Sequence, residues 1–182
     1  MKEEGRGEKG QARQNEEDDR WHKTKPGWHK VNVDAGWSEG VGLGLGAVCR
    51  DEIGAVMWGI VWQERAQRDT AMLEAKAVLM GSKEARRAGL SHIIIESDCL
   101  TVVEDLKKKK RGRGDIGLVY DDIFDLCLHF AEVEFVFSRR SCNKVAHELV
   151  HVRPWEAGSR FWPGDLPPYI NDVAASDIGD LI

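Results

Sequence analysis

Three acidic residues are spaced so that they could bind divalent metal ions together. Asp34 ends a short run of alternating apolar and polar residues, Asp98 ends a longer apolar run, and Glu74 lies in the first turns of a predicted helix. If the two aspartates end neighbouring parallel strands, both reach one rim of the sheet, and a helix that begins near that rim can add Glu74. Converging carboxylates repel each other unless cations lie between them. Because Mg²⁺ accepts oxygen ligands, the pattern favours a magnesium site.

Two Mg²⁺ (or Mn²⁺) ions held by these acids would be suited to phosphodiester hydrolysis. Such ions can clamp the attacking water and the leaving oxygen of the phosphodiester. Each acid alone is more simply read as a structural residue: Asp34 or Asp98 would cap or turn the chain, and Glu74 would be an exposed helix acid. The hypothesis of a metal site therefore depends on the three acids occurring together.

The elements that position the acids follow from hydrophobic periodicity. Alternation at period two predicts strands, apolar residues at steps of three and four predict amphipathic helices, and Gly89 and Pro154 mark helix ends. The predicted strands are 28–34, 40–50, 55–62, 92–98 and 133–137, and the predicted helices are 70–88, a second from about 99, a third over 116–130 and a last from 141 or 143 to 152. This order predicts an α/β fold with a five-stranded mixed sheet, in which an antiparallel meander is joined to parallel strands by flanking helices.

Composition divides the chain of 182 residues into one domain and two tails. Residues 1–26 are rich in charge and offer almost nothing to bury, so we expect a disordered N-terminal tail. Residues 27–153 should form the domain. The Trp- and Pro-containing residues 154–182 should form an irregular C-terminal tail.

Composition also limits the cellular setting. The four cysteines have no CxxC spacing, so neither a zinc framework nor a disulfide framework is expected. No apolar N-terminal signal is visible, and the longest apolar stretch, 55–62, is too short to cross a bilayer. We expect a soluble, intracellular monomer in the nucleus or cytoplasm, with no membrane partner. With a net charge of −5, any binding to nucleic acid must depend on a local basic patch.

Taken in order, the motifs resemble the ribonuclease H family, most closely its plant reverse-transcriptase-like branch, found in LINE-type retroelements and their domesticated relatives. The resemblance covers about 28–152 and is carried by Val31–Gly36, Gly44–Asp51, Leu73–Ala75, Ile95–Asp98 and Arg140–Leu149. It implies a ribonuclease H-like fold and metal-dependent hydrolysis of the RNA strand of an RNA–DNA hybrid, which leaves a 5′-phosphate and a 3′-hydroxyl.

The resemblance also assigns site residues. Asp34, Glu74 and Asp98 match the first three acids of the family's four-carboxylate site, with Asp34 bridging two ions and the other two acids each completing one coordination shell. The fourth acid is replaced by His147, a frequent variant in the plant branch. A neutral imidazole can ligate a metal or shuttle protons, but it brings one negative charge fewer. Glu148 points about 100° further round the helix and is a poor substitute.

Two departures from the family leave a second hypothesis open. One is His147 in place of the fourth acid. The other is the segment 138–142, in which the histidine-bearing loop of well-studied cellular members is not evident. The alternative is a catalytically inactive, retroelement-derived module that binds nucleic acid or protein.

A basic run and an arginine pair are candidate nucleic-acid contacts. The run comprises Lys107, Lys108, Lys109, Lys110, Arg111 and Arg113, and the pair is Arg139 and Arg140. The run could be a phosphate-binding ridge, which would make binding strongly salt-dependent. It could equally be a solvated helix end, placed favourably at the negative end of the helix dipole, or a nuclear-localisation signal. The sequence leaves these alternatives open.

Two further motifs match known site patterns, but the residues around them do not fit such sites. His147–His151 spells HExxH, the helical zinc motif of metalloproteases, but Pro154 ends the helix and no third ligand follows at a suitable spacing. Gly42, Gly44 and Ala47 fit the dinucleotide-binding pattern GxGxxA, but they lie inside a predicted strand and not between a strand and a helix. We interpret the glycines as a thin strand face that admits a close neighbour.

Overall fold

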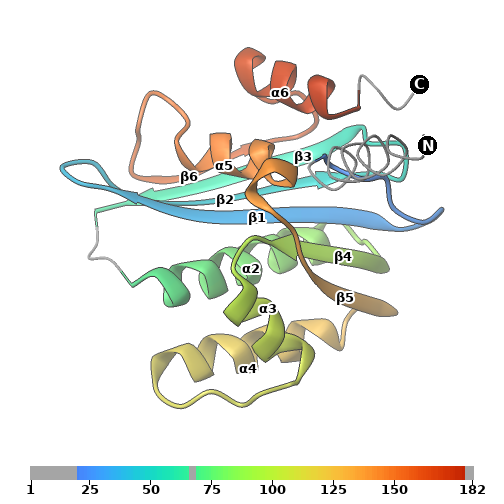
Figure 1. The fold of residues 1–182 in the computed structure, drawn as a ribbon, viewed down its shortest axis with the longest axis vertical. Helices are drawn as coiled ribbons and strands as arrows, with labels where there is room; N and C mark the ends of the chain where they lie inside the picture. The colour runs from blue at the N-terminus through green and yellow to red at the C-terminus, as the bar shows by residue number, and fades with distance from the viewer. Residues whose placement is uncertain (1–19, 66–68, 179–182) are drawn as a thin grey trace, which may run out of the picture.

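A six-stranded mixed sheet forms the centre of the computed structural model, which describes residues 20–65 and 69–178 (Figure 1). The strands are β1 (His29–Ser38), β2 (Gly42–Arg50), β3 (Val56–Glu64), β4 (His92–Ser97), β5 (Glu132–Phe137) and β6 (Gly158–Trp162), in the spatial order β5-β4-β1-β2-β3-β6. The α-helices are α2 (Thr70–Arg87), α3 (Leu100–Lys107), α4 (Asp115–Cys127), α5 (Lys144–Val150) and α6 (Pro168–Ile178). The predicted α/β fold with a mixed sheet is confirmed, with one strand more than the five expected.

The pairing of β1 with β4 determines where the candidate site lies. β1, β2 and β3 form the predicted antiparallel meander, and β1 pairs in parallel with β4 on its other side. A parallel pair needs a crossover connection, which α2 supplies across one face of the sheet. Val33 pairs with Ser97, so Asp34 and Asp98, which follow them, lie at the same level along the sheet.

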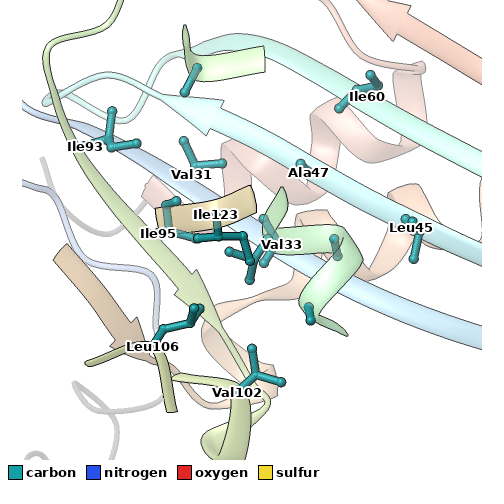
Figure 2. Close-up of a cluster of buried hydrophobic side chains, with 14 of the residues drawn as sticks. Val31, Val33, Leu45, Ala47, Ile60, Ile93, Ile95, Val102, Leu106 and Ile123 are labelled. Carbon is teal, nitrogen blue, oxygen red and sulfur yellow. The ribbon is translucent and has the colours of Figure 1, made fainter. Parts of the chain in front are cut away.

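Helices cover both faces of the sheet. In Figure 1, α2, α3 and α4 lie on one face, and α5 and α6 lie on the other. Alternate strand residues, among them Val31, Val33, Ile93 and Ile95, point toward the first helix layer and form the main core (Figure 2). Side chains from the opposite face of β2 and β3 form a second core with α5 and α6. The period-two alternation of β1 therefore places Val31 and Val33 in the main core and the buried polar side chains of Asn32 and Asp34 on the opposite face.

The expectation that 154–182 is an irregular tail is wrong. β6 pairs antiparallel with β3, and α6 packs on the second core. Phe161 stacks on Trp58 with ring centroids 6.4 Å apart, and Ile170 and Ala174 are buried one helical turn apart. The aromatic and proline content of this segment suggested irregular structure. The segment is regular because it packs on β3 and on the second core, and both lie far from it in the sequence. Proline is in fact well suited to the first turn of a helix, which is its place in α6.

The predicted disordered tail 1–26 has an ordered end. Residues 1–19 lie outside the described residues, but Trp21 is 1% exposed and its indole N–H donates to Asn32 Oδ1 at 3.0 Å. The ring also lies against two cations, with Lys30 Nζ and the Arg50 guanidinium 5.0 and 4.7 Å from its centroid. Burial of one large aromatic side chain offsets the entropy cost of ordering a short segment. The average composition of the charged tail did not indicate that a single tryptophan in it would be buried.

A buried ion pair joins α6 to the sheet. Arg50 Nη2 donates to Asp177 Oδ2 at 2.8 Å, and the two side chains are 1% and 4% exposed. Burial lowers the pKa of Arg50, and the charge of Asp177 opposes that effect. Because an uncompensated ion in the interior costs several kcal/mol, each member of this pair depends on the other.

We predict that Asp177→Ala lowers the free energy of unfolding by about 3–5 kcal/mol, because it leaves the Arg50 charge buried without its partner. Urea unfolding followed by circular dichroism at neutral pH measures the change. Asp172→Ala, at an exposed position of the same helix, is the matched control and should stay within about 0.5 kcal/mol of the unmodified protein. Equal stabilities of the two variants would show that the ion pair does not stabilise α6.

Candidate metal centre

Asp34 lies in the middle of β1. The prediction that the strand ends at this residue is wrong, because Ala35–Ser38 continue the ladder with Gly42–Leu45 of β2. Asp34 pairs with Gly46, and its side chain is 1% exposed. A carboxylate on a central strand is held more rigidly than one on a turn, so the position of Asp34 is fixed by the sheet itself.

Glu74 and Asp98 reach the same point from two further elements. α2 begins after Asp69, whose side chain caps the helix by accepting a hydrogen bond from Met72 N at 3.2 Å, and Glu74 follows in the next turn with 4% exposure. Asp98 comes directly after β4. One carboxylate oxygen from each of Asp34, Glu74 and Asp98 lies within 4.8 Å of the other two. The structure therefore brings together the three acids selected from the sequence.

The donor atoms at this point fit a divalent cation. Asp34 Oδ1 and Glu74 Oε2 are buried and have no hydrogen-bond partner among the described residues. Burial, and then the neighbouring charges of Asp34 and Asp98, raise the pKa of Glu74 to about 8. Carboxylate oxygens left without a partner in the interior are costly, and a hard cation is the partner that would satisfy several of them at once. An all-oxygen donor set of this kind suits Mg²⁺ or Mn²⁺.

Basic side chains contact two of the three acids. His147, on α5, has Nδ1 at 2.8 Å from Asp34 Oδ2, and this hydrogen bond raises the pKa of the imidazole although partial burial opposes it. Arg140 Nε donates to Asp98 Oδ2 at 3.1 Å. Arg140 opens the short 3₁₀ turn η1 (Arg140–Cys142), directly after Arg139. The structure thus places His147 beside Asp34, and one member of the arginine pair against Asp98.

Glycines of β2 determine how closely α5 approaches the sheet. A Cβ at Gly46 would lie 2.6 Å from the backbone oxygen of Ala146, and one at Gly44 would also collide with the backbone of the helix. The prediction that these glycines admit a close neighbour is therefore confirmed. This close approach is what brings His147 within hydrogen-bond distance of the buried acid in β1.

Two polar side chains fix the ends of α5, and sequence reasoning missed both roles. Asn143 Nδ2 donates to Val33 O at 2.8 Å at the start of the helix. Gln63, fully buried in β3, donates through Nε2 to Val150 O at 3.2 Å at its end. Asn143 gave one signal, as a possible first residue of the helix. Nothing local could indicate that Gln63 caps a helix 87 residues further along the chain.

The HExxH motif does not assemble a zinc site. The rings of His147 and His151 meet edge to face with centroids 4.8 Å apart, and His147 Nδ1 is engaged with Asp34. In the described part of the chain, the only group of three or more His, Cys, Asp or Glu side chains placed to hold a metal ion is Asp34, Glu74 and Asp98. The histidine pair therefore lacks the third ligand that zinc hydrolysis requires.

The basic run follows α3 and lies away from the acids. Its first member, Lys107, is the last residue of α3, and the others lie in the connection to α4. Lys108 Nζ is 3.3 Å from a carboxylate oxygen of Glu104, and Lys110 Nζ is 3.2 Å from one of Asp105. Part of the positive charge of the run is therefore balanced by acids of α3 itself.

A family model described as reverse transcriptase-like matches residues 32–152. Ribonuclease H1 from Halobacterium salinarum is similar with a TM-score of 0.62 and 16% identity, over 68% of this chain and 95% of that chain. The N-terminal RNase H domain of a Mycobacterium tuberculosis protein, solved as a fusion with maltose-binding protein, is similar with a TM-score of 0.62 and 18% identity, over 82% of this chain and 96% of that chain. LC11 ribonuclease H1, solved in complex with an RNA/DNA hybrid, is similar with a TM-score of 0.60 and 17% identity, over 68% of this chain and 94% of that chain.

No curated protein matches the sequence. At the identities given above, the likeness to solved structures establishes the fold, and it confirms the predicted ribonuclease H-like architecture. The family match begins within β1 and ends just after α5, and so it includes the three acids and His147. The chain belongs to the reverse transcriptase-like family and has a ribonuclease H-like fold.

Proposed function

We propose that the protein is a metal-dependent endonuclease that hydrolyses the RNA strand of RNA–DNA hybrids. The observation that carries this proposal is the group Asp34, Glu74 and Asp98, with carboxylate oxygens within 4.8 Å of one another and two buried oxygens that have no partner among the described residues. The ribonuclease H-like fold supports it, as does the similar LC11 ribonuclease H1, which was solved with an RNA/DNA hybrid. Converging carboxylates of this kind suit phosphodiester hydrolysis.

In this proposal, Asp34, Glu74 and Asp98 hold two Mg²⁺ (or Mn²⁺) ions, which when bound would supply Lewis acidity toward the scissile phosphate. Glu74 must lose its proton to act as a ligand, because burial and neighbouring charge raise its pKa to about 8. His147 holds a proton at Nδ1 in its hydrogen bond to Asp34, which leaves Nε2 to accept or donate a proton at the edge of the site. The imidazole thus keeps Asp34 oriented while the ring stays available for proton transfer.

Basic side chains would bind the substrate backbone. Arg140 contacts Asp98 through Nε, and its side chain is 65% exposed, so its remaining N–H groups can reach a phosphate oxygen. Arg139 would add a further salt-dependent contact along the hybrid.

The cellular setting is also part of the proposal. We infer a protein that acts as a monomer in the nucleus or cytoplasm and that derives from a plant LINE-type retroelement. Among the described residues, no helix combines the length and the apolar character needed to span a bilayer.

A specific observation also favours the alternative, a catalytically inactive module that binds nucleic acid. Asp34 and Asp98 are hydrogen-bonded to His147 and Arg140, and the histidine stands where the family has a fourth acid. Both contacts reduce the negative charge available to a metal ion. An inactive module would bind hybrids without cutting them, so a cleavage assay separates the two functions.

We predict that the full chain cuts the RNA strand of an end-labelled RNA–DNA hybrid in Mg²⁺ or Mn²⁺ but not in EDTA. Asp34→Asn should lower the rate by about 10³-fold, because it removes one of the carboxylates that would hold the ions and with it several kcal/mol of transition-state stabilisation. Asp121→Asn, on the exposed side of α4, is the matched control and should cut at the unmodified rate. Tight, salt-sensitive binding without cutting would assign the protein to the inactive class.

The role of His147 can be measured through metal affinity. We predict that His147→Asp binds Mn²⁺ about tenfold more tightly than the unmodified protein in calorimetry, because it restores a fourth carboxylate. His147→Asn removes the imidazole without adding charge and should not tighten binding. If the two variants bind Mn²⁺ equally, the side chain at this position does not face the metal centre.

The raised pKa of Glu74 links the stability of the metal-free protein to pH. An acid whose pKa is higher in the folded chain, here about 8 against 4.5, binds its proton more tightly when folded. Its contribution to stability is therefore complete below the unfolded value and is lost as the pH rises through the folded value. We predict that the melting temperature in EDTA falls from about pH 5 to pH 8.5, and that Glu74→Gln reduces this fall by on the order of 5 °C.

Differential scanning calorimetry measures this effect. Glu104→Gln, on the exposed face of α3, is the control and should keep the full pH dependence. Adding Mg²⁺ at pH 8.5 should raise the melting temperature of the unmodified protein more than that of Glu74→Gln. Identical pH profiles for the two variants would show that Glu74 does not carry the shifted proton.

A further inference from the structure

The outer edge of β5 is open. β5 is the last strand of the sheet, and in the described part of the chain it pairs only with β4 (Figure 1). The amides of Glu132 and Ser138 donate toward the β4 side. Because main-chain groups alternate along a strand, those of Val133 and Phe135 point away from β4. A row of unpaired N–H and C=O groups is a template on which another strand can form.

A groove of about 780 Å³ runs along this edge. Its floor is apolar, with Leu106 from α3, Phe124 from α4, and Val133 and Phe135 from β5. Leu128, which follows α4 and also lines the groove, is 82% exposed. Leu106 belongs to the main core, and Phe124, Val133 and Phe135 are partly buried against it, so the floor is the outer side of that core beside one fully exposed leucine. An apolar surface of this kind is typical of a site that another molecule covers.

The basic run is divided between this groove and its own helix. Lys107, Lys109 and Arg111 line the groove, whereas Lys108 and Lys110 pair with acids of α3. The backbone of Lys109 is in the left-handed region, with φ at 50°, where α3 gives way to the connection. The three groove residues have no ion-pair partner among the described residues. The rim of the groove is therefore cationic and its floor apolar.

We propose that the groove binds an extended acidic and apolar segment of a partner protein, which adds a strand to β5. The main chain of the segment would pair with the open edge, apolar side chains would contact the floor, and acidic side chains would meet the three cations at the rim. Glu132 and Glu134 of β5 also line the groove, and Glu134 is paired with Lys25 at 2.6 Å. The three cations outnumber these acids, so the rim keeps an excess of positive charge, and the site is independent of the metal centre.

A peptide accounts for more of the groove than nucleic acid does. A phosphate backbone would use the three cations, but it would leave the apolar floor and the main-chain edge without partners. An extended peptide uses all three features. The run itself supplies matched variants, since Lys109 and Arg111 line the rim, whereas Lys108 and Lys110, of equal charge, pair with acids of α3.

The probe is a pooled set of fluorescent nine-residue peptides in which Val, Ile or Leu alternates with Thr, with two Glu residues at either end. A matching set carries Lys in place of Glu. We expect the acidic set to bind the full chain with a Kd of roughly 10–100 μM in fluorescence anisotropy and to shift the amide resonances of β5 in NMR spectra. The basic set should bind about tenfold more weakly.

Matched variants test the rim and the floor. Lys109→Gln with Arg111→Gln should weaken binding of the acidic set about fivefold, whereas Lys108→Gln with Lys110→Gln should change it less than about twofold. Leu128→Ser should also weaken it, while Leu118→Ser, on a side chain that is 66% exposed outside the groove, should not. Both leucines are open to solvent, so neither change should disturb folding.

Three results would overturn the proposal. One is the absence of binding at about 1 mM peptide, and another is equal binding of the acidic and basic sets. The third is a loss of hybrid affinity that is larger in the Lys109 and Arg111 variant than in the Lys108 and Lys110 variant, with no effect on peptide binding, which would assign the rim to nucleic acid. None of these outcomes depends on whether the metal centre cleaves hybrids.

Discussion

The structure depends on holding three carboxylates, two of them buried and the third half-buried, at one point. Two unit charges about 5 Å apart repel by roughly 3 kcal/mol at an effective dielectric constant of 20, and Asp34, Glu74 and Asp98 lie within 4.8 Å of one another. Rigid elements resist this repulsion: the sheet holds the two aspartates, and α2, packed over the main core, holds the glutamate. A raised pKa on Glu74, an imidazole against Asp34 and a guanidinium against Asp98 relieve part of it. Divalent ions would relieve it more fully, which is why the arrangement is best understood as a metal centre.

The acids could be found from the sequence because each belongs to an element with a strong local pattern. Alternation in β1, the apolar run of β4 and the amphipathic stripe of α2 predict the element types, and the short crossover predicts that β1 and β4 are parallel neighbours. The level of Asp34 relative to Asp98 then follows from strand register. The predicted position of Asp34 at the end of its strand was wrong. The β1–β2 ladder continues for four residues that a pattern rich in glycine does not distinguish from a turn.

The remaining errors concern contacts between segments that are distant in the chain. Trp21 is buried because Lys30, Asn32 and Arg50 surround its ring. The residues next to Trp21 in the sequence give no indication of this burial. β6 exists because β3 offers an edge about a hundred residues earlier in the chain. The packing of α5 on β2 could be predicted in part. The glycines of β2 indicated a close neighbour, but only the structure identifies that neighbour as α5. Local pattern predicts elements, and tertiary contacts decide their limits.

The two ends of the part of the chain that the structure describes lie together. A Cβ added to Gly54 would lie 3.1 Å from the ring of Trp21 and 2.6 Å from the side chain of Ile178, so the segment that opens the domain and the helix that closes it meet at one loop. Both lie beyond the part shared with the family, which spans 32–152. A domain whose ends are adjacent can be inserted into a surface loop of another protein without forcing that loop apart. The two ends of this domain are therefore close enough for a host polypeptide to carry the domain as an insertion in one of its surface loops.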